Sequence, residues 1–386
     1  MGLGKAAVRC HITPKQSLLL RLLAIALLLL LTCLDSLPPL LPSPVMLLAG
    51  VPSPPLPACV PLHPQNTNGS WYQDSLQPSW LHFAPAQPCQ YSISSPSDFF
   101  ARVHGRTLAF VGDSQVREFT SSLAAHMLRC CWMQQAPACN HSQVLDAAVC
   151  KQVELAESYP KAPVSFSLRD ASGHRVTLVY SWLAYPREGL DPEKSYYLLP
   201  FLAGNASAQP DALLMSWGHW DLIFSVPRRS DNLGGRNELL AYAEQLAGLV
   251  QQAAAARPAI KRVLTWRQLY PDEVDALPHP QFRKRMILPS FRAEAREGLR
   301  AIWEGKVGLR VWDPYAKLDV RAGGVQRAWN ENMLTLDGMH LKREVDVELA
   351  WELLSYWAEA VVGPALPLGS LEEAVPGSGR HSRGEQ

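Results

Sequence analysis

Two short motifs that lie far apart in the chain carry the residue types needed for ester chemistry. One is Gly112–Ser114 and the other is Asp337–His340. A serine hydroxyl is a weak nucleophile that needs an adjacent base, and the base needs a third group that holds its tautomer. Asp337 is close enough in sequence to His340 to orient the imidazole while the ring reaches a serine elsewhere. We therefore predict a catalytic triad of Ser114, His340 and Asp337.

Each motif also has a simpler interpretation. A Gly-Asp-Ser sequence by itself is a common turn, and an Asp-x-x-His sequence often marks a helix start with a surface histidine. The setting of Ser114 favours the chemical interpretation, because the serine follows the apolar run Thr107–Val111 and precedes a helical pattern. This context predicts a strand-to-helix turn, and the chain order Ser, Asp, His is one of several that such triads use.

The elements that must position these residues alternate along the chain. Strands are predicted at Thr107–Val111, Arg175–Trp182, Ala212–Trp217, Ile260–Trp266 and Leu309–Trp312. Helices are predicted at Gln115–Leu128, Glu238–Ala256, Phe291–Trp303 and Arg343–Val362. Short apolar strands that alternate with longer helices are typical of an α/β fold, here a three-layer α/β/α sandwich with a mainly parallel sheet. The connections 129–175 and 183–210 show no strong periodicity, and we expect them to shape a groove near the site.

Ligands of such sheets bind beyond the carboxyl ends of the strands. Ser114, His219 and Arg267 each follow the end of a predicted strand. The motifs and the architecture therefore predict the same location for the site.

Further blocks of sequence fit one family pattern. Arg117 extends the first motif to Gly-Asp-Ser-x-x-Arg, a Gly-x-x-Asp-Leu block occurs at Gly218–Leu222, and a later strand ends in Trp266 and Arg267. Together with Asp337–Leu341, these blocks make residues 105–362 similar to the SGNH/GDSL-type hydrolases. The chain more closely resembles the branch that holds the PC-esterases, the plant trichome-birefringence-like polysaccharide O-acetyltransferases and the lumenal domain of the sialic-acid O-acetyltransferase.

The resemblance implies serine-dependent acyl-ester chemistry on glycan hydroxyls. It implies either O-acetyl transfer, which is slightly favoured, or ester hydrolysis. No cofactor or metal is implied, and the acyl donor stays open. The predicted partners are a glycan or polysaccharide acceptor and, for a transferase, a multi-spanning protein that delivers the acyl group. Arg117, Trp266 and Arg267 are predicted to bind substrate, with a structural salt bridge as the alternative for Arg117.

The oxyanion hole is where the chain departs from the family. Trp220 occupies the position of the family's asparagine. We expect the backbone N–H groups of Ser114 and Gly218 to hold the oxyanion, with the side chain of His219 or Trp220 assisting. The missing asparagine keeps a second function open, namely a catalytically idle SGNH scaffold that binds glycans or a partner protein.

The N-terminal region predicts a membrane anchor. Basic residues in 1–17, expected to be cytosolic, precede a leucine-rich run at 18–34, which predicts an uncleaved signal anchor. Residues 35–64 form a proline-rich stalk, 65–363 the SGNH-like lumenal domain and 364–386 a disordered polar tail. The prediction is a single-pass type II protein of the Golgi or secretory pathway, with a cleaved signal peptide and a secreted protein as the alternative.

Cysteines and glycosylation acceptors agree with a lumenal domain. Asn68, Asn140 and Asn205 each begin an Asn-x-Ser acceptor. The cysteines beyond the anchor predict disulfides of open pairing, and their spacing fits no common zinc pattern; they are Cys59, Cys89, Cys130, Cys131, Cys139 and Cys150. The balance of 36 Lys+Arg against 35 Asp+Glu, without a basic patch, argues against a nucleic-acid partner.

Overall fold

The structure is a computed structural model that describes residues 56–63, 69–73, 81–130, 144–155, 163–204, 209–224, 233–269, 289–318 and 341–362. The chain divides into two units, Met1–Pro55 and Leu56–Gln386, and all described residues belong to the second.

Several predictions fall on residues outside these ranges. They concern the signal anchor at 18–34, the tail at 364–386, Asp337, His340, Cys131, Cys139 and the acceptors Asn68, Asn140 and Asn205. Within the described ranges, no helix is both long enough and apolar enough to cross a membrane.

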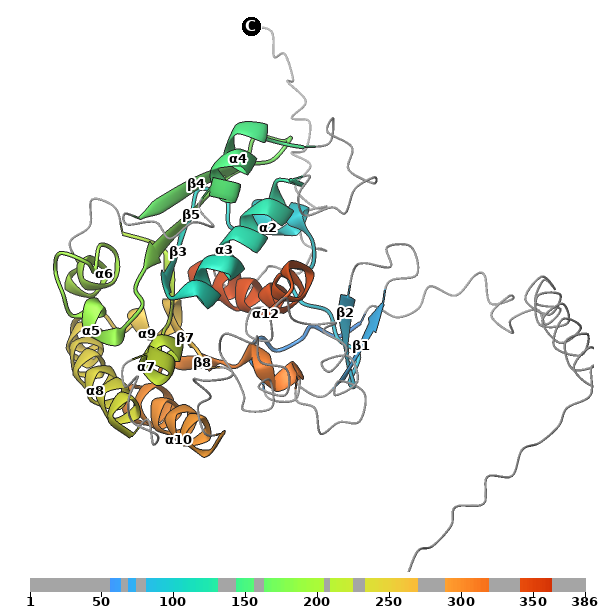
Figure 1. Cartoon of the computed structure of the whole chain (residues 1–386). Helices are drawn as coiled ribbons and strands as arrows, with labels where there is room; N and C mark the ends of the chain where they lie inside the picture. The colour runs from blue at the N-terminus through green and yellow to red at the C-terminus, as the bar shows by residue number, and fades with distance from the viewer. Residues whose placement is uncertain are drawn as a thin grey trace, which may run out of the picture. The chain divides into compact units, whose positions relative to one another are not determined.

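A mixed, mostly parallel sheet of six strands forms the centre of the described domain, which has an α/β fold (Figure 1). The strand order is β4-β5-β3-β6-β7-β8, and every neighbouring pair is parallel except β4 with β5. The strands are β3 (Thr107–Gly112), β4 (Val164–Arg169), β5 (Arg175–Trp182), β6 (Ala212–Ser216), β7 (Leu264–Arg267) and β8 (Arg310–Trp312). A separate antiparallel pair joins β1 (Gly69–Gln73) to β2 (Leu81–Pro85).

Helices cover both faces of the sheet (Figure 1). One face carries α2 (Pro96–Arg102), α3 (Ser114–Met127), α4 (Ala147–Leu155) and α12 (Arg343–Val362). The other carries α5 (Pro186–Gly189), α6 (Leu198–Ala203), α7 (His219–Phe224), α8 (Leu233–Ala256), α10 (Pro289–Arg300) and the π-helix η7 (Ala301–Val307). Short helices also precede β7, as α9 (Ile260–Val263), and follow β8, as η8 (Pro314–Leu318).

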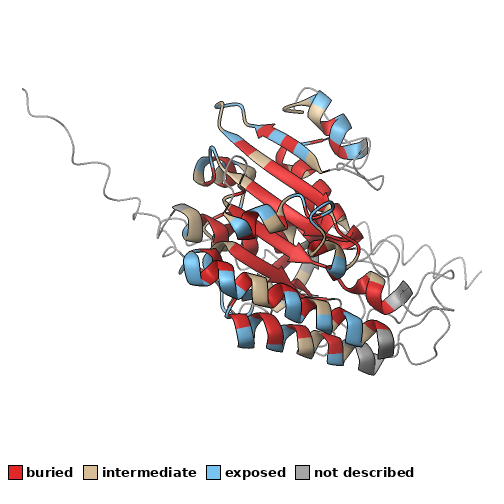
Figure 2. Cartoon of the chain, turned by 90° about the vertical axis from the view of Figure 1, so that its left-hand side faces the viewer, coloured by how far each residue is buried: buried red, intermediate tan, exposed pale blue. Residues whose placement is uncertain are grey.

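The alternation of side chains along β3 explains the two apolar cores. Leu108 and Phe110 pack into the cluster that includes α3 and α12, whereas Ala109 and Val111 pack into the cluster that includes α8 and α10. A strand with both faces covered must be apolar at every position, as β3 is. Figure 2 shows the central strands buried and the long helices exposed along their outer sides.

Two sequence-based assignments need correction. The predicted strand Ile260–Trp266 begins with a helical turn, α9, and pairs with β6 only from Leu264, which lies opposite Leu213. Since β6 begins at Ala212, earlier residues would have little strand to pair with. The connection 129–175 also contains α4 and the edge strand β4, in which Phe166 and Leu168 are buried. Polar and apolar residues alternate along β4, which is the sequence pattern of a half-buried strand.

Two disulfides are present, Cys59–Cys89 and Cys130–Cys150. The first ties the segment before β1 to the segment after β2, and the second ties the end of α3 to α4. These bonds indicate an oxidising secretory or extracellular environment. The prediction of disulfides is confirmed for these four cysteines.

Candidate active site

Ser114 is the first residue of α3, and Asp113 alone separates it from Gly112, the last residue of the central strand β3. The turn needs glycine at position 112, because a Cβ there would lie 1.9 Å from the carbonyl oxygen of Ser216. Ser114 is 7% exposed and lies at the positive end of a 14-residue helix. The sequence prediction of a strand-to-helix turn at Ser114 is confirmed.

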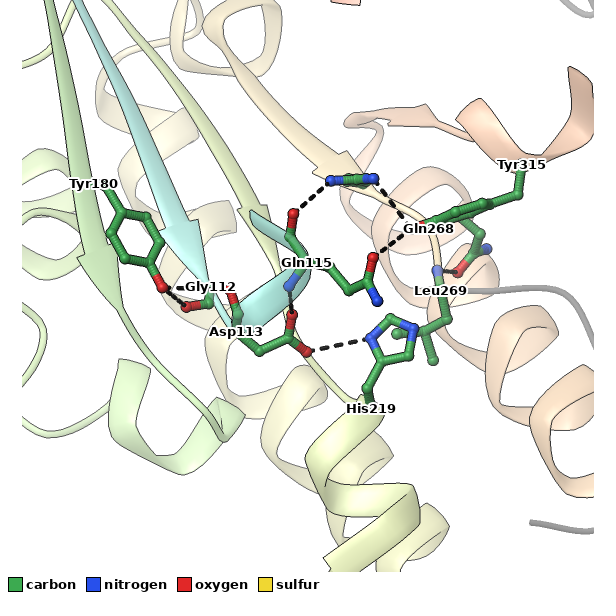
Figure 3. A network of polar contacts seen from close by, with 9 residues as sticks. Gly112, Asp113, Gln115, Tyr180, His219, Gln268, Leu269 and Tyr315 are labelled. Carbon is green, nitrogen blue, oxygen red and sulfur yellow. Dashed lines mark hydrogen bonds and ion pairs between the residues drawn. The ribbon is translucent and has the colours of Figure 1, made fainter. Parts of the chain in front are cut away.

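Asp113 holds this turn through both of its carboxylate oxygens (Figure 3). As the N-cap of α3, it accepts a hydrogen bond from the Gln115 N–H at 3.0 Å through Oδ1. Its Oδ2 lies 3.2 Å from Nδ1 of His219, and Asp113 and His219 are 0% and 5% exposed. An ionised carboxylate can only accept, so Nδ1 of His219 carries a proton in this pair. Asp113 therefore fixes both the helix start and the orientation of the His219 ring.

The backbone brings His219 to this position through the neighbouring strand. β6 pairs with β3 in parallel, with Ser216 opposite Gly112, so the turns that follow the two strands are neighbours. The Asp113 N–H donates to the Ser216 carbonyl at 3.3 Å. Gly218 has a φ of +125°, which L side chains rarely adopt, and α7 begins at the next residue. A glycine at 218 thus permits the sharp turn that directs His219 toward Asp113.

The two candidate oxyanion side chains point to different surroundings. His219 bonds to the residue adjacent to Ser114, whereas Trp220 packs edge-to-face with Trp182 at 5.8 Å and with Tyr185 at 6.4 Å between ring centroids. The geometry therefore favours His219 over Trp220 as the side chain available to the chemistry at Ser114.

Arg267 joins the nucleophile turn to two other parts of the fold. Its Nη1 donates to the Gln115 carbonyl at 3.2 Å, and its Nη2 donates to the Tyr315 hydroxyl at 3.1 Å. The same Nη2 lies 3.4 Å from Oδ1 of Asp346, near the start of α12. All four residues are at most 3% exposed. This buried network links the ends of β3 and β7 with η8 and α12.

The positions predicted to bind substrate are largely buried. Trp266 is 0% exposed and packs against Trp217 and Trp303, so it belongs to the apolar core. Arg267 is 1% exposed and engaged in its network. Both side chains are thus enclosed in the described structure, and their direct contact with substrate stays a prediction. Arg117 is 7% exposed and forms an ion pair with Glu118 at 3.0 Å, which fits the alternative prediction of a structural salt bridge for this residue.

Asp221 is an unusual carboxyl group near the site. It lies in the first turn of α7 and is 4% exposed. Burial raises the pKa of Asp221 to about 8; the charge of Arg187 opposes this rise, and the charges of Asp113 and Glu238 add to it. At neutral pH this carboxyl therefore keeps its proton most of the time.

The second half of the predicted triad, Asp337 and His340, lies outside the described residues. Leu341, which follows His340 directly, is 1% exposed and packs in the same core as Val116 and Phe119 of α3. In the described ranges, no group of three or more His, Cys, Asp or Glu side chains is placed to hold a metal ion. A cavity of about 300 Å³ at β8, lined by Arg310 and Glu352 among others, includes no residue of the Ser114 turn.

Comparison with protein-family models and with curated proteins finds no match to this chain. The functional assignment therefore depends on the residues and geometry of the site.

Proposed function

We propose that the chain is a serine-dependent acyl-ester enzyme of the SGNH type, which transfers O-acetyl groups to glycan hydroxyls or hydrolyses them. The observation that carries the proposal is the position of Ser114, at the N-terminus of α3 and just beyond the carboxyl end of the central strand. Nucleophilic serines of α/β enzymes occupy turns of this kind. The description of the domain as an SGNH-like three-layer sandwich is part of this proposal.

Three features support Asp337 and His340 as partners of Ser114. The segment that carries them leads directly into α12, and α12 packs against α3. Arg267 contacts both Gln115, next to Ser114, and Asp346, in the first turn of α12. Arg267 thus ties the start of α12 to the nucleophile turn. The start of α12 also follows His340, the predicted triad histidine, closely in the sequence.

In the proposed mechanism, His340 takes the proton of the Ser114 hydroxyl as Oγ attacks the acyl carbonyl. Asp337 stabilises the resulting imidazolium. The carbonyl oxygen becomes an oxyanion, and the alkoxide leaving group takes the proton from His340 as the tetrahedral intermediate collapses to the acyl-serine. Water or a sugar hydroxyl then attacks the acyl-serine, His340 accepts its proton, and Ser114 is released with its own proton restored.

The oxyanion needs donors that are in place before it forms. The N–H groups of Ser114 and Gly218 are candidates, and the N-terminus of α3 favours negative charge. The ring of His219 is held beside Ser114 by its contact with Asp113, and it donates to the oxyanion only when Nε2 carries a proton. Trp220 is the weaker candidate because its ring packs among aromatic side chains.

The compartment proposed is the Golgi or secretory-pathway lumen, with the chain held at the membrane by its N-terminal anchor. The disulfides support an oxidising environment, in which glycan esters are accessible substrates. A transferase would also need a multi-spanning partner that delivers the acyl group.

A fluorophosphonate probe tests the nucleophile directly, because it labels only activated serines. We expect the full chain to label at Ser114 and the Ser114→Ala variant not to label. Ser97, an exposed serine outside the site, provides the matched control, and Ser97→Ala should label as the wild type does. Asp337→Asn should reduce labelling strongly, since neutralising the triad carboxylate of a well-studied protease lowers kcat by about 10⁴-fold.

Labelling that survives Ser114→Ala would contradict the proposal. A folded wild-type chain that does not label at all would favour the idle scaffold that binds glycans or a partner. If Ser114 labels, incubation with acetylated glycans and with an isotopically labelled acyl donor separates the two reactions. Release of acetate to water indicates an esterase, and label on the glycan indicates a transferase.

A further inference from the structure

Three aromatic side chains and one arginine gather beside the Ser114 turn. Trp220 packs edge-to-face with Trp182 at 5.8 Å and Tyr185 at 6.4 Å, and the Arg187 guanidinium lies 4.6 Å from the centre of the Tyr185 ring. We call Trp182, Tyr185, Arg187 and Trp220 the aromatic corner. Its three rings are only partly buried and Arg187 is exposed, so the corner belongs to the surface.

The topology places this corner next to the nucleophile. Trp182 ends β5 directly opposite Gly112 in the parallel register, and the N–H of Leu183 donates to the Gly112 carbonyl at 2.9 Å. Trp220 follows His219, which bonds to Asp113. The corner is therefore assembled from the two turns that flank the Ser114 turn.

The charge of Arg187 is available to a ligand. Its guanidinium carbon lies over the Tyr185 ring, and Arg187 forms no ion pair within 4.0 Å with any residue that the structure describes. The adjacent carboxylate, Glu188, is already bonded to Lys194 at 3.2 Å and accepts the N–H of Ala184 at 2.7 Å.

We propose that the aromatic corner is a binding subsite for a sugar ring that carries a carboxylate. In the function proposed above, on which this role depends, the subsite holds the glycan so that its hydroxyl or ester reaches Ser114. Aromatic rings offer flat apolar surface to the C–H face of a sugar, and their rigidity makes binding cost little conformational entropy. The planar guanidinium fork matches a carboxylate through two parallel hydrogen bonds.

Asp221 makes this subsite sensitive to pH. Burial raises the pKa of Asp221 to about 8, so below that pH its carboxyl is mainly neutral and leaves Arg187 to the ligand. Above pH 8, the ionised carboxylate competes for Arg187 and repels an anionic sugar. The other charged groups that act on Asp221 are Asp113 and Glu238, and both are acidic. We therefore expect affinity for an acidic sugar to fall as the pH rises through about 8.

The test measures binding in a chain that cannot turn over. The full chain with Ser114→Ala is titrated by calorimetry with tetragalacturonate, a glucuronate-containing tetrasaccharide and sialyllactose, each beside its carboxyl-reduced counterpart. We expect at least one acidic probe to bind, and its reduced form to bind at least about tenfold more weakly, as loss of a charge-assisted pair requires.

Variants of the same chain locate the contact. Arg187→Gln should weaken binding of the acidic probe about tenfold and leave the reduced probe unaffected. Lys194→Gln removes the same charge from an exposed neighbour and is the matched control, with an expected change below about twofold. Trp220→Leu should weaken both probes, and Asp221→Asn should remove the fall in affinity above pH 8. Circular dichroism and thermal unfolding verify that each variant is folded.

Two outcomes overturn the subsite. One is that no acidic probe binds better than its reduced form, and the other is that Arg187→Gln and Lys194→Gln have equal effects. These results are independent of the chemistry at Ser114. If the acidic probe binds but the wild type does not label with fluorophosphonate, the subsite stands and the proposed enzymatic function is refuted. If the wild type labels but no acidic probe binds, the enzymatic function stands and the subsite is refuted.

Discussion

Replacing Arg267 with methionine tests the buried network that holds the nucleophile turn. Methionine has a similar length but donates no hydrogen bond, so Arg267→Met leaves the Gln115 carbonyl, the Tyr315 hydroxyl and the Asp346 carboxylate without this donor. Asp346 is 2% exposed, so its charge loses a cation in a site that water does not reach. Removing one member of a buried ion pair costs about 3–5 kcal/mol.

Thermal and urea unfolding of the purified chain measure this cost. For a domain of this size, ~1 kcal/mol corresponds to about 2–4 °C, so we expect Arg267→Met to lower Tm by roughly 6–20 °C. Arg262 lies on α9 in the turn before β7 and is exposed, which makes Arg262→Met the matched control. Its expected effect is within about 0.5 kcal/mol.

A double-mutant cycle separates the ion pair from the rest of the network. Combining Arg267→Met with Asp346→Leu removes both charges, so the double variant should be more stable than the sum of the two single losses predicts, by about 1–3 kcal/mol. Residual activity supplies a second readout, because the Gln115 carbonyl is adjacent to Ser114 and its displacement should lower kcat more than it raises KM. Strict additivity, together with a loss below about 1 kcal/mol for Arg267→Met, would refute the role of Arg267 as the link between α3 and α12.

The remaining predictions concern pH and disulfides. The folded chain keeps a proton on Asp221 up to about pH 8, whereas the unfolded chain loses it near pH 4, so the wild type loses stability as the pH rises between these values. The Asp221→Asn variant has no such proton, and its stability relative to the wild type should rise by about 1.4 kcal/mol per pH unit. Urea unfolding at pH 5 and pH 8 measures this difference. Burial and the charge of Arg129 lower the pKa of His126 to about 4, so the wild type should lose stability as pH falls from 6.5 toward 4, and His126→Gln should flatten that slope. Replacing both Cys130 and Cys150 with alanine should cost about 3 kcal/mol in unfolding free energy, and an unchanged transition would contradict this.

Local patterns predicted the elements that carry the site. The bounds of β5 at Arg175–Trp182 and of α12 at Arg343–Val362 match the sequence prediction, because each element has a continuous apolar pattern with clear ends. The turn at Ser114 was also predictable, since an apolar strand meets a helix there at Gly112 and Asp113. The start of β7 was not, because the β-branched residues of α9 have strand propensity and only the register with β6 excludes them.

The partners within the site could not be predicted from local sequence. Asp113 and His219 are 106 residues apart, and Arg267 and Asp346 are 79 apart. No spacing rule pairs residues at such separations. The first pair forms because β3 and β6 are neighbours in the sheet, and the second forms where the end of β7 meets the first turn of α12. The family pattern identified Asp113, His219 and Arg267 as notable positions, but it did not show that Arg267 acts inside the core.

The burial of these residues separates two roles around the Ser114 turn. Asp113 and Arg267 are buried, and their side-chain hydrogen bonds go to residues inside the fold, namely Gln115, His219, Tyr315 and Asp346. The partly exposed groups beside the turn come from the end of β5, from α5 and from Trp220 of α7. Substitutions in the buried set should therefore lower stability and turnover with every acyl ester alike. Substitutions of Trp182, Tyr185 and Arg187 in the aromatic corner should instead change which sugar is bound, while a small ester without a sugar reacts at its normal rate.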